Sequence, residues 1–309
     1  MTTSFRYLSA AFLLALLLVA TGVAHAQDRP GVETRRDIVY ATHDGERLLA
    51  DWYGPSAPGP YPAIIAVHGG GWQAGDKTSY RFWGPYLAER GYVLMAIKYR
   101  FSKPGQRGFP QAVHDVRAAV QYARHNAGEL KINPDRLALM GDSAGGHLAA
   151  LVALAGDHPV FAGAYQDDPY ARLPTKVKAV VGVYGIYDMA AQWNHDQVHR
   201  PLDQITEKFI GVKPMEDRKA YFDASPLSYA TLSNNPTSFF LTWNPEDDIV
   251  DPKSQSEAFL IALKQARFYV RTAISSGTPH FWITDPIEDA DSRTGSLAPG
   301  LIRFLQERL

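Results

Sequence analysis

The residue whose surroundings most strongly indicate chemistry is Ser143. It stands in Gly141-Asp142-Ser143-Ala144-Gly145, a Gly-x-Ser-x-Gly pattern, after the apolar run Leu137 to Met140 and before a helical pattern that begins at His147. A strand that turns abruptly into a helix strains the backbone of such a serine and exposes its hydroxyl, while the helix N-terminus favours developing negative charge. We therefore predict a nucleophile for acyl transfer. The alternative is a glycine-rich turn that only connects strand to helix.

A second glycine-rich motif, His68-Gly69-Gly70-Gly71-Trp72, directly follows the apolar run Ala63 to Val67. Three consecutive glycines cost conformational entropy on folding. They are explained if the backbone must approach a substrate closely and point its N–H groups at a developing oxyanion. We expect Gly70 and Gly71 to supply two donors and Ala144 a third. A phosphate-binding loop is the alternative, but the Lys-Ser/Thr ending of a P-loop is absent.

The general base should be one of ten histidines. His280 lies in a loop after the last predicted strand and before a closing helix that starts near Leu297. His68 precedes the nucleophile, and we expect its ring to hold the glycine run by bonding to nearby backbone. His147 lies too near Ser143 on the same helix to reach it. Elimination and position therefore favour His280 as the base.

An acid that orients this histidine should lie between nucleophile and base, just past a strand. The run Asn244 to Asp248 follows the predicted strand Phe239 to Trp243 and contains three acids. Asp247 is our choice, and Glu246 and Asp248 stay open as alternatives. An ordinary solvated loop that caps the next helix is the other interpretation of this cluster.

The elements that must position these residues are short apolar runs that alternate with longer helical patterns. This alternation is typical of an α/β fold with a mainly parallel sheet, whose core strands are buried on both faces. The clearest helix places Val113, Val116, Val120 and Ala123 on one face. Residues 189–230 show no clean period and predict an irregular helical cap or lid. The expected strands are Ala63–Val67, Val93–Ile97, Leu137–Met140, Val177–Tyr184, Phe239–Trp243 and Phe268–Ile274, with an edge hairpin of Asp37–Tyr40 and Arg47–Trp52.

The first residues predict export. Arg6 lies in a short polar start, Ala10 to Ala20 is almost entirely apolar, and Ala24-His25-Ala26 offers a small-x-small cleavage site. The apolar stretch is shorter than the roughly 20 residues of a membrane-spanning helix. We therefore expect a signal peptide at residues 1–26, one catalytic domain at 27–309, and a periplasmic or secreted protein.

Composition removes several classes of function. The chain has no cysteine, which excludes disulfides, thiolate zinc sites and a cysteine nucleophile. Lys and Arg number 31 against 32 Asp and Glu, and no dense basic run argues for nucleic acid. We expect no metal and no organic cofactor. A calcium site of Asp247, Asp248 and Asp251 is a weaker alternative, because this spacing matches no known calcium loop.

Together, His-Gly-Gly-Gly-Trp, Gly-Asp-Ser-Ala-Gly-Gly-His-Leu-Ala and the late His280 resemble the α/β-hydrolase superfamily from about Asp37 onward. Residues 109–157 are similar to bacterial carboxylesterases grouped with acetyl and feruloyl esterases, and the hormone-sensitive-lipase-like esterases are close kin. These relatives usually carry His-Gly where this chain has Trp243-Asn244, and Pro where it has Asp251. The resemblance implies an α/β-hydrolase fold with a central sheet flanked by helices and a small cap.

These features predict a serine carboxylesterase for short acyl or aromatic acids, such as acetyl or feruloyl groups on plant polysaccharide. Trp72, Tyr184 and Phe281 are the expected substrate contacts, and an ester is the expected partner. An amidase, formamidase or peptidase on the same fold is an alternative. So is a catalytically silent binding protein, although such proteins typically lose the nucleophile or the base.

Overall fold

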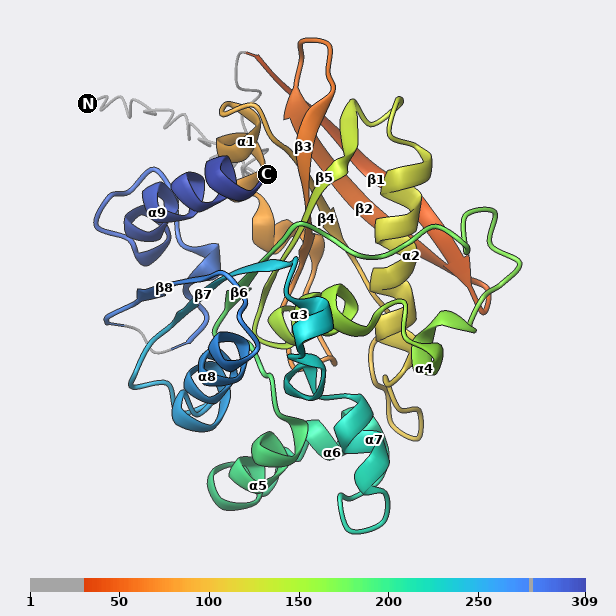
Figure 1. Cartoon of the computed structure of the whole chain (residues 1–309), viewed down its shortest axis with the longest axis vertical. Helices are drawn as coiled ribbons and strands as arrows, with labels where there is room; N and C mark the ends of the chain where they lie inside the picture. The colour runs from red at the N-terminus through yellow and green to blue at the C-terminus, as the bar shows by residue number, and fades with distance from the viewer. Residues whose placement is uncertain (1–30, 278–279) are drawn as a thin grey trace, which may run out of the picture.

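The computed structural model describes residues 31–277 and 280–309 (Figure 1). The expected signal peptide lies outside the described residues, so export stays a prediction. An eight-stranded sheet in the order β1-β2-β4-β3-β5-β6-β7-β8 forms the centre. The strands are β1 (Val32–His43), β2 (Glu46–Pro55), β3 (Tyr61–Val67), β4 (Val93–Ile97), β5 (Ile132–Asp142), β6 (Ala179–Val183), β7 (Ser238–Trp243) and β8 (Val270–Ile274).

The sheet is mainly parallel, as expected. The strands β3 to β8 pair in parallel with one another, and β1 and β2 form the predicted antiparallel hairpin at one edge. The expectation of burial on both faces is wrong for β8. Its residues are half-buried or exposed, and Ile274 is 58% exposed. The reason is position, because β8 is the outer edge and pairs only with β7.

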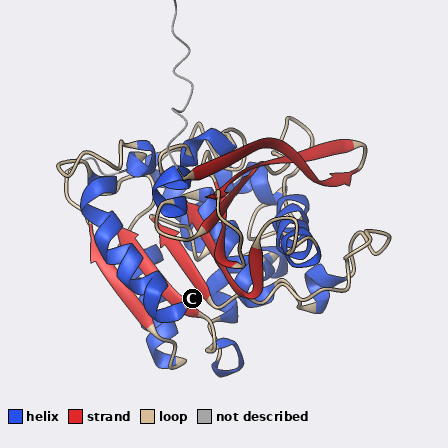
Figure 2. Ribbon diagram, turned by 90° about the horizontal axis from the view of Figure 1, so that it is seen from above, coloured by secondary structure: helices blue, strands red, loops and turns tan. Residues whose placement is uncertain are grey.

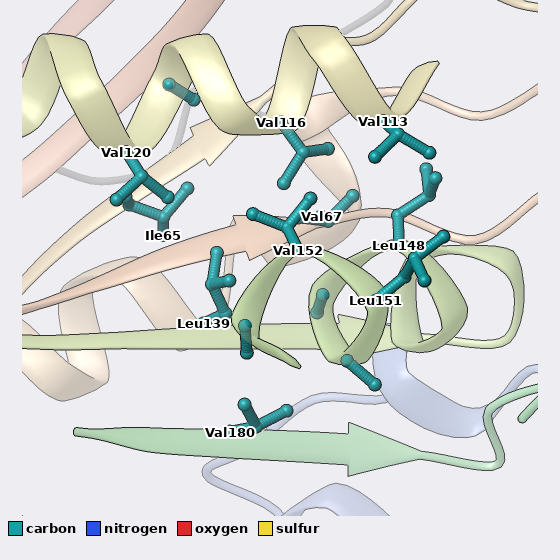
Figure 3. Packing of buried hydrophobic residues seen from close by; sticks show 14 of the residues in the cluster. Ile65, Val67, Val113, Val116, Val120, Leu139, Leu148, Leu151, Val152 and Val180 are labelled. Carbon is teal, nitrogen blue, oxygen red and sulfur yellow. The ribbon is translucent and has the colours of Figure 1, made fainter. Parts of the chain in front are cut away.

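Helices cover both faces of the sheet (Figure 2). On one face α2 and α3 pack on inward-pointing residues of β3, β5 and β6 (Figure 3). On the other face α1 and α9 pack on the alternate residues of the same strands. The bounds are α1 (Trp83–Ala88), α2 (Gln111–His125), α3 (Ala144–Ala155), α4 (Pro159–Ala162), α8 (Ala258–Gln265) and α9 (Arg293–Arg308).

The predicted apolar face of α2 is confirmed. Val113, Val116 and Val120 are fully buried, and Ala123 is 2% exposed. In Figure 3 the three valines point from α2 toward β3 and toward Leu148 and Val152 of α3. Alternating inward residues Ile65 and Val67 of β3 meet them. This packing fixes α3, the helix that follows Ser143, against the sheet.

The segment between β6 and β7 is irregular and helical, as expected for a cap. It contains α5 (Met189–His199), α6 (Ile205–Ile210) and α7 (Arg218–Asp223), followed by two single-turn helices. In Figure 1 these helices gather at one end of the sheet. No helix in the described part of the chain is long and apolar enough to cross a membrane.

Candidate active site

Ser143 occupies the turn between β5 and α3. β5 ends at Asp142 and α3 begins at Ala144, and Ser143 between them has φ 51° and ψ −121°. Such a positive φ is strained for a residue with a side chain and persists only where its surroundings enforce it. Here Ser143 N–H donates to Val183 O at 2.9 Å. A Cβ on Gly145 would come within 1.9 Å of Val67 O, so only glycine permits this tight turn.

Three side chains from distant parts of the sequence meet at this turn. His280 Nε2 lies 3.0 Å from Ser143 Oγ, and His280 Nδ1 lies 2.6 Å from Asp247 Oδ2. All three residues are buried, with 6% or less of each exposed. The structure therefore brings together the predicted nucleophile, base and acid. A histidine so placed can accept the serine proton while the carboxylate orients its ring.

The surroundings of Asp247 distinguish it from its acidic neighbours. Its Oδ1 accepts hydrogen bonds from the N–H groups of Ile249 and Val250, both at 3.0 Å, which leaves Oδ2 for His280. Glu246 and Asp248 are exposed. Within residues 31–277 and 280–309, no group of three acids, histidines or cysteines is arranged to hold a metal ion. The geometry favours Asp247 as the partner of His280.

Neighbouring groups hold the loop of His280 in place. The Tyr184 ring lies 4.3 Å from the imidazole, and Tyr184 Oη accepts a hydrogen bond from Ile283 N–H at 3.1 Å. Asn244 Nδ2 donates to Gly277 O at 3.0 Å and so ties the loop of the acid to that of the base. Sequence reasoning noted Asn244 only as a departure from the His-Gly pair of similar esterases and did not assign it this role.

Two of the three expected substrate contacts lie in the interior. Trp72 is fully buried, stacks on Phe209 at 4.5 Å, and donates from its indole N–H to His147 Nδ1 at 3.1 Å. Tyr184 is 1% exposed. Neither side chain offers surface to a substrate, because each is used in packing. Phe281 differs, since its ring is 64% exposed and lies edge-on to His280 at 4.6 Å.

The glycine loop has the structural histidine expected of it. His68 Nδ1 lies 2.7 Å from Gly69 O, and the ring stacks on Tyr99 at 4.6 Å. Burial lowers the pKa of His68 to about 4, so the ring is neutral at neutral pH. The loop itself turns at Gly70, where φ is 113° and a Cβ would lie 2.2 Å from Ala74 O. Glycine is required there for both reasons.

Asp142, which precedes the nucleophile, links this loop to the turn. Its Oδ1 accepts hydrogen bonds from Gly69 N–H at 3.1 Å and from Tyr80 Oη–H at 2.9 Å. Burial raises the pKa of Asp142 to about 6, although both hydrogen bonds act in the opposite direction. Sequence reasoning missed this role. An acid directly between a buried strand and the predicted nucleophile was the signal that could have revealed it.

The elements that carry the expected oxyanion donors lie on two sides of Ser143, and the roles of Gly70, Gly71 and Ala144 stay predictions. Ala144 opens α3, and the first N–H groups of a helix have no partner within it. The glycine run approaches from β3, and a Cβ on Gly69 would lie 3.1 Å from Ser143 Cβ. The run and the helix N-terminus thus flank the serine, as an oxyanion hole needs.

Comparison with known proteins gives one family and several relatives. The family model called BD-FAE matches residues 50–263. Esterase LipQ of Mycobacterium tuberculosis is 32% identical over 236 residues, which are 74% of this chain and 52% of LipQ. The chain spans about half the length of the first curated relatives it matches. Kynurenine formamidase of Danio rerio is 28% identical over 84% of this chain and 79% of its own length.

Solved structures show the same fold. Est2, a thermophilic esterase of the planctomycete Thermogutta terrifontis, superposes with a TM-score of 0.69 at 22% sequence identity. The match covers 88% of this chain and 92% of Est2. At this identity the likeness concerns the fold alone, and it agrees with the α/β-hydrolase fold expected from the sequence.

Proposed function

The chain belongs to the BD-FAE family on the α/β-hydrolase fold, and from this premise we propose that it hydrolyses carboxylic esters with Ser143 as nucleophile. One observation carries the proposal: His280 lies within hydrogen-bond distance of both Ser143 Oγ and Asp247 Oδ2. The first contact lets His280 Nε2 take the serine proton, and the second orients the ring and stabilises the imidazolium that forms. The names of esterase relatives such as LipQ support the same chemistry.

The proposed reaction has two acyl-transfer steps. Ser143 Oγ bonds to the ester carbonyl carbon while its proton passes to His280 Nε2. Asp247 Oδ2 accepts the Nδ1–H bond and stabilises the imidazolium. When the C–O bond to the alcohol breaks, Nε2–H protonates the leaving oxygen and an acyl-serine remains. His280 Nε2 then takes a proton from a water molecule, whose oxygen attacks the acyl carbon. The bond to Ser143 Oγ breaks, Nε2–H returns a proton to Oγ, and the carboxylic acid is released.

Backbone N–H groups would stabilise the negative charge that forms on the carbonyl oxygen. We assign this role to Ala144 at the start of α3, together with Gly70 and Gly71 in the glycine run. Fixed donors in a site that excludes water act more strongly than the same groups in solution. The hydrogen bond from Gly69 N–H to Asp142 holds the run beside the nucleophile turn.

The direct test compares Ser143→Ala with Ser296→Ala, a matched change at an exposed serine on α9. With p-nitrophenyl acetate, Ser143→Ala should lower kcat by at least about 10³-fold, whereas Ser296→Ala should not. A fluorophosphonate probe should label wild type and Ser296→Ala but not Ser143→Ala. Undiminished turnover by Ser143→Ala would overturn the mechanism. Absence of both turnover and labelling in wild type would instead indicate a silent binding protein.

The finer proposal concerns the acid. We propose short acyl or aromatic acids, such as acetyl or feruloyl groups, as the transferred part of the ester. The exposed Phe281 ring beside His280 supports this, because it can contact an aromatic acid at the site of reaction. A chain-length series of p-nitrophenyl esters, with acetylated xylan and methyl ferulate, tests it. Preference for long-chain triglyceride would contradict it.

A second candidate is amide hydrolysis, because one relative is named kynurenine formamidase. The same serine and histidine can release an amine, since the histidine of such a triad can also give its proton to a leaving nitrogen. Phenyl acetate and acetanilide form a matched pair that differs only in the bond broken. If kcat/KM for the anilide equals or exceeds that for the ester, the amidase assignment replaces the esterase one.

A further inference from the structure

A cavity of about 760 Å³ lies between the loop after β4 and the cap helix α6. One wall begins on the glycine loop, because the lining residue Gln73 donates its N–H to Gly70 O at 3.1 Å. A Cβ on Gly71 would lie 3.7 Å from the side chain of Ile205, the first residue of α6, so the glycine loop and α6 lie close together. The cavity therefore borders the loop that carries the proposed oxyanion donors.

The lining of this cavity is cationic. Lys103, Arg107 and Lys208 contribute to it against a single acid, Glu207. The acid already accepts a hydrogen bond from Trp193 Nε1–H at 3.2 Å. The nearest carboxylates to the two lysines are 3.8 and 4.0 Å away on partly exposed side chains, so these ion pairs are weak. Among the residues that line the cavity, three are cations and one is an acid.

Hydrogen bonds and packing hold the backbone that presents these groups. Lys103 and Gln106 exchange both backbone hydrogen bonds, at 2.9 and 2.8 Å, around a Pro104-Gly105 turn. The stem of Arg107 packs on Gly211, where a Cβ would lie 2.9 Å from its side chain. Phe209 O accepts the N–H groups of residues 108 and 109, which ties the loop to α6. A wall built in this way loses little entropy on binding.

We propose that this cavity binds a carboxylate carried by the ester substrate, on either its acid or its alcohol part. The inference rests on the proposed esterase function and names the class of ester that the site prefers. The guanidinium of Arg107 can bind a carboxylate with two parallel hydrogen bonds. The ammonium groups of Lys103 and Lys208 add positive charge beside it. The volume is large enough for a substituent of the size of one sugar acid.

The experiment uses esters that differ only in charge. Wild-type protein is assayed at low ionic strength with 3-acetoxybenzoate against 3-acetoxybenzamide, and with 3-(4-acetoxyphenyl)propionate against its amide, which places the charge further from the acetyl group. In at least one pair, kcat/KM for the anionic ester should be about tenfold higher, mainly through KM. High salt should reduce this excess. Equal values in both pairs would overturn the inference while leaving esterase activity intact, whereas no turnover of any ester would overturn the proposed function.

Variants locate the preference in the cavity. The double change Arg107→Gln with Lys208→Gln should bring kcat/KM for the anionic ester close to that for the neutral ester. Lys208→Gln alone changes an exposed side chain and serves if the double variant folds poorly. It should partly lower the preference for the anionic ester. Arg303→Gln, an exposed cation on α9, is the matched control and should keep the full preference. An undiminished preference in Lys208→Gln and the double variant would place the anion elsewhere.

Discussion

At the scale of single residues, the candidate site depends on how two carboxylates are surrounded. Asp247 has both oxygens engaged, one by two backbone N–H groups and one by His280. Asp142 is equally buried but faces Tyr80 and a glycine N–H, and burial raises its pKa to about 6. Asp247 is placed to act on the base. Asp142 is placed to hold two loops together.

Asp247→Asn should retain the fold and lose the reaction. An amide cannot hold His280 in the tautomer that accepts the serine proton, so kcat should fall by up to about 10⁴-fold. The measurement is turnover of p-nitrophenyl acetate. The control is Asp248→Asn, a change at the exposed neighbouring acid, which should keep activity. If Asp248→Asn lost activity and Asp247→Asn did not, the acid would be misassigned.

Asp142→Asn should change how stability depends on pH. The folded pKa of Asp142 is raised above its unfolded value, so the folded state holds this proton more tightly. Its contribution to stability is therefore lost as pH rises from about 4 to above 6, by about 3 kcal/mol in total. Asparagine does not titrate. Urea unfolding at pH 4.5 and 7.5 measures the free energy of unfolding of both proteins. The stability of the variant relative to wild type should be greater at pH 7.5 than at pH 4.5. A difference between the two proteins that does not change with pH would contradict this.

At the scale of elements, the cap and the glycine loop support each other. Trp72 of the loop stacks on Phe209 of α6 and bonds to His147 of α3. His147 Nε2 in turn contacts Ala224 O, just after α7, at 2.7 Å. Burial lowers the pKa of His147 to about 4, which leaves its ring neutral and able to accept from the indole. The cap is thus part of the support of the active site.

Trp72→Phe should therefore affect stability more than substrate binding. The stack on Phe209 survives, but His147 Nδ1 becomes a buried acceptor without a donor, which costs about 1–3 kcal/mol. Urea unfolding measures the loss, and KM for p-nitrophenyl esters should stay close to wild type.

Phe281→Ala is the complementary change. It should leave stability within about 0.5 kcal/mol and raise KM for aryl esters. If Trp72→Phe raised KM without loss of stability and Phe281→Ala left KM unchanged, Trp72 would be a substrate contact after all.

At the scale of the whole molecule, a buried ionic cluster ties the N-terminal hairpin to the helical layer. His43 at the end of β1 is 1% exposed, and its two ring nitrogens lie 2.8 Å from Asp115 of α2 and 3.0 Å from Asp168. Arg100 also bonds to Asp115. Burial alone would lower the pKa of His43, but the hydrogen bonds to both carboxylates outweigh it and raise that pKa.

The raised pKa of His43 predicts a second dependence of stability on pH. Its contribution is complete below the unfolded value of about 6.5 and is lost as pH rises through the folded pKa. Thermal unfolding should thus show a larger Tm difference between wild type and His43→Gln at pH 5.5 than at pH 8.5. His125→Gln, on the same helix as Asp115, should show no such difference. A larger effect at high pH would contradict the sign.

The strands and the nucleophile turn were accessible from sequence because both are local. Val93 to Ile97 is continuously apolar, and the structure has a strand with these same bounds. The exposed edge strand β8 was not predictable in the same way. The sequence of β8 and the residues just before it, from Phe268, resembles that of a core strand. Only the strand order shows that β8 pairs with a single strand, β7, and therefore lies at the edge of the sheet.

By itself, the sequence determined that a strand turns into a helix at Ser143 and that a glycine run follows another strand, because each pattern is a run of neighbouring residues. Tertiary structure alone decided that Asp247 rather than Asp248 meets His280, that Trp72 and Tyr184 are buried, and that three cations line one cavity. These outcomes join segments tens of residues apart. Hydrogen bonds tolerate errors of only a few tenths of an ångström, and hydrophobic periodicity does not specify the backbone so closely.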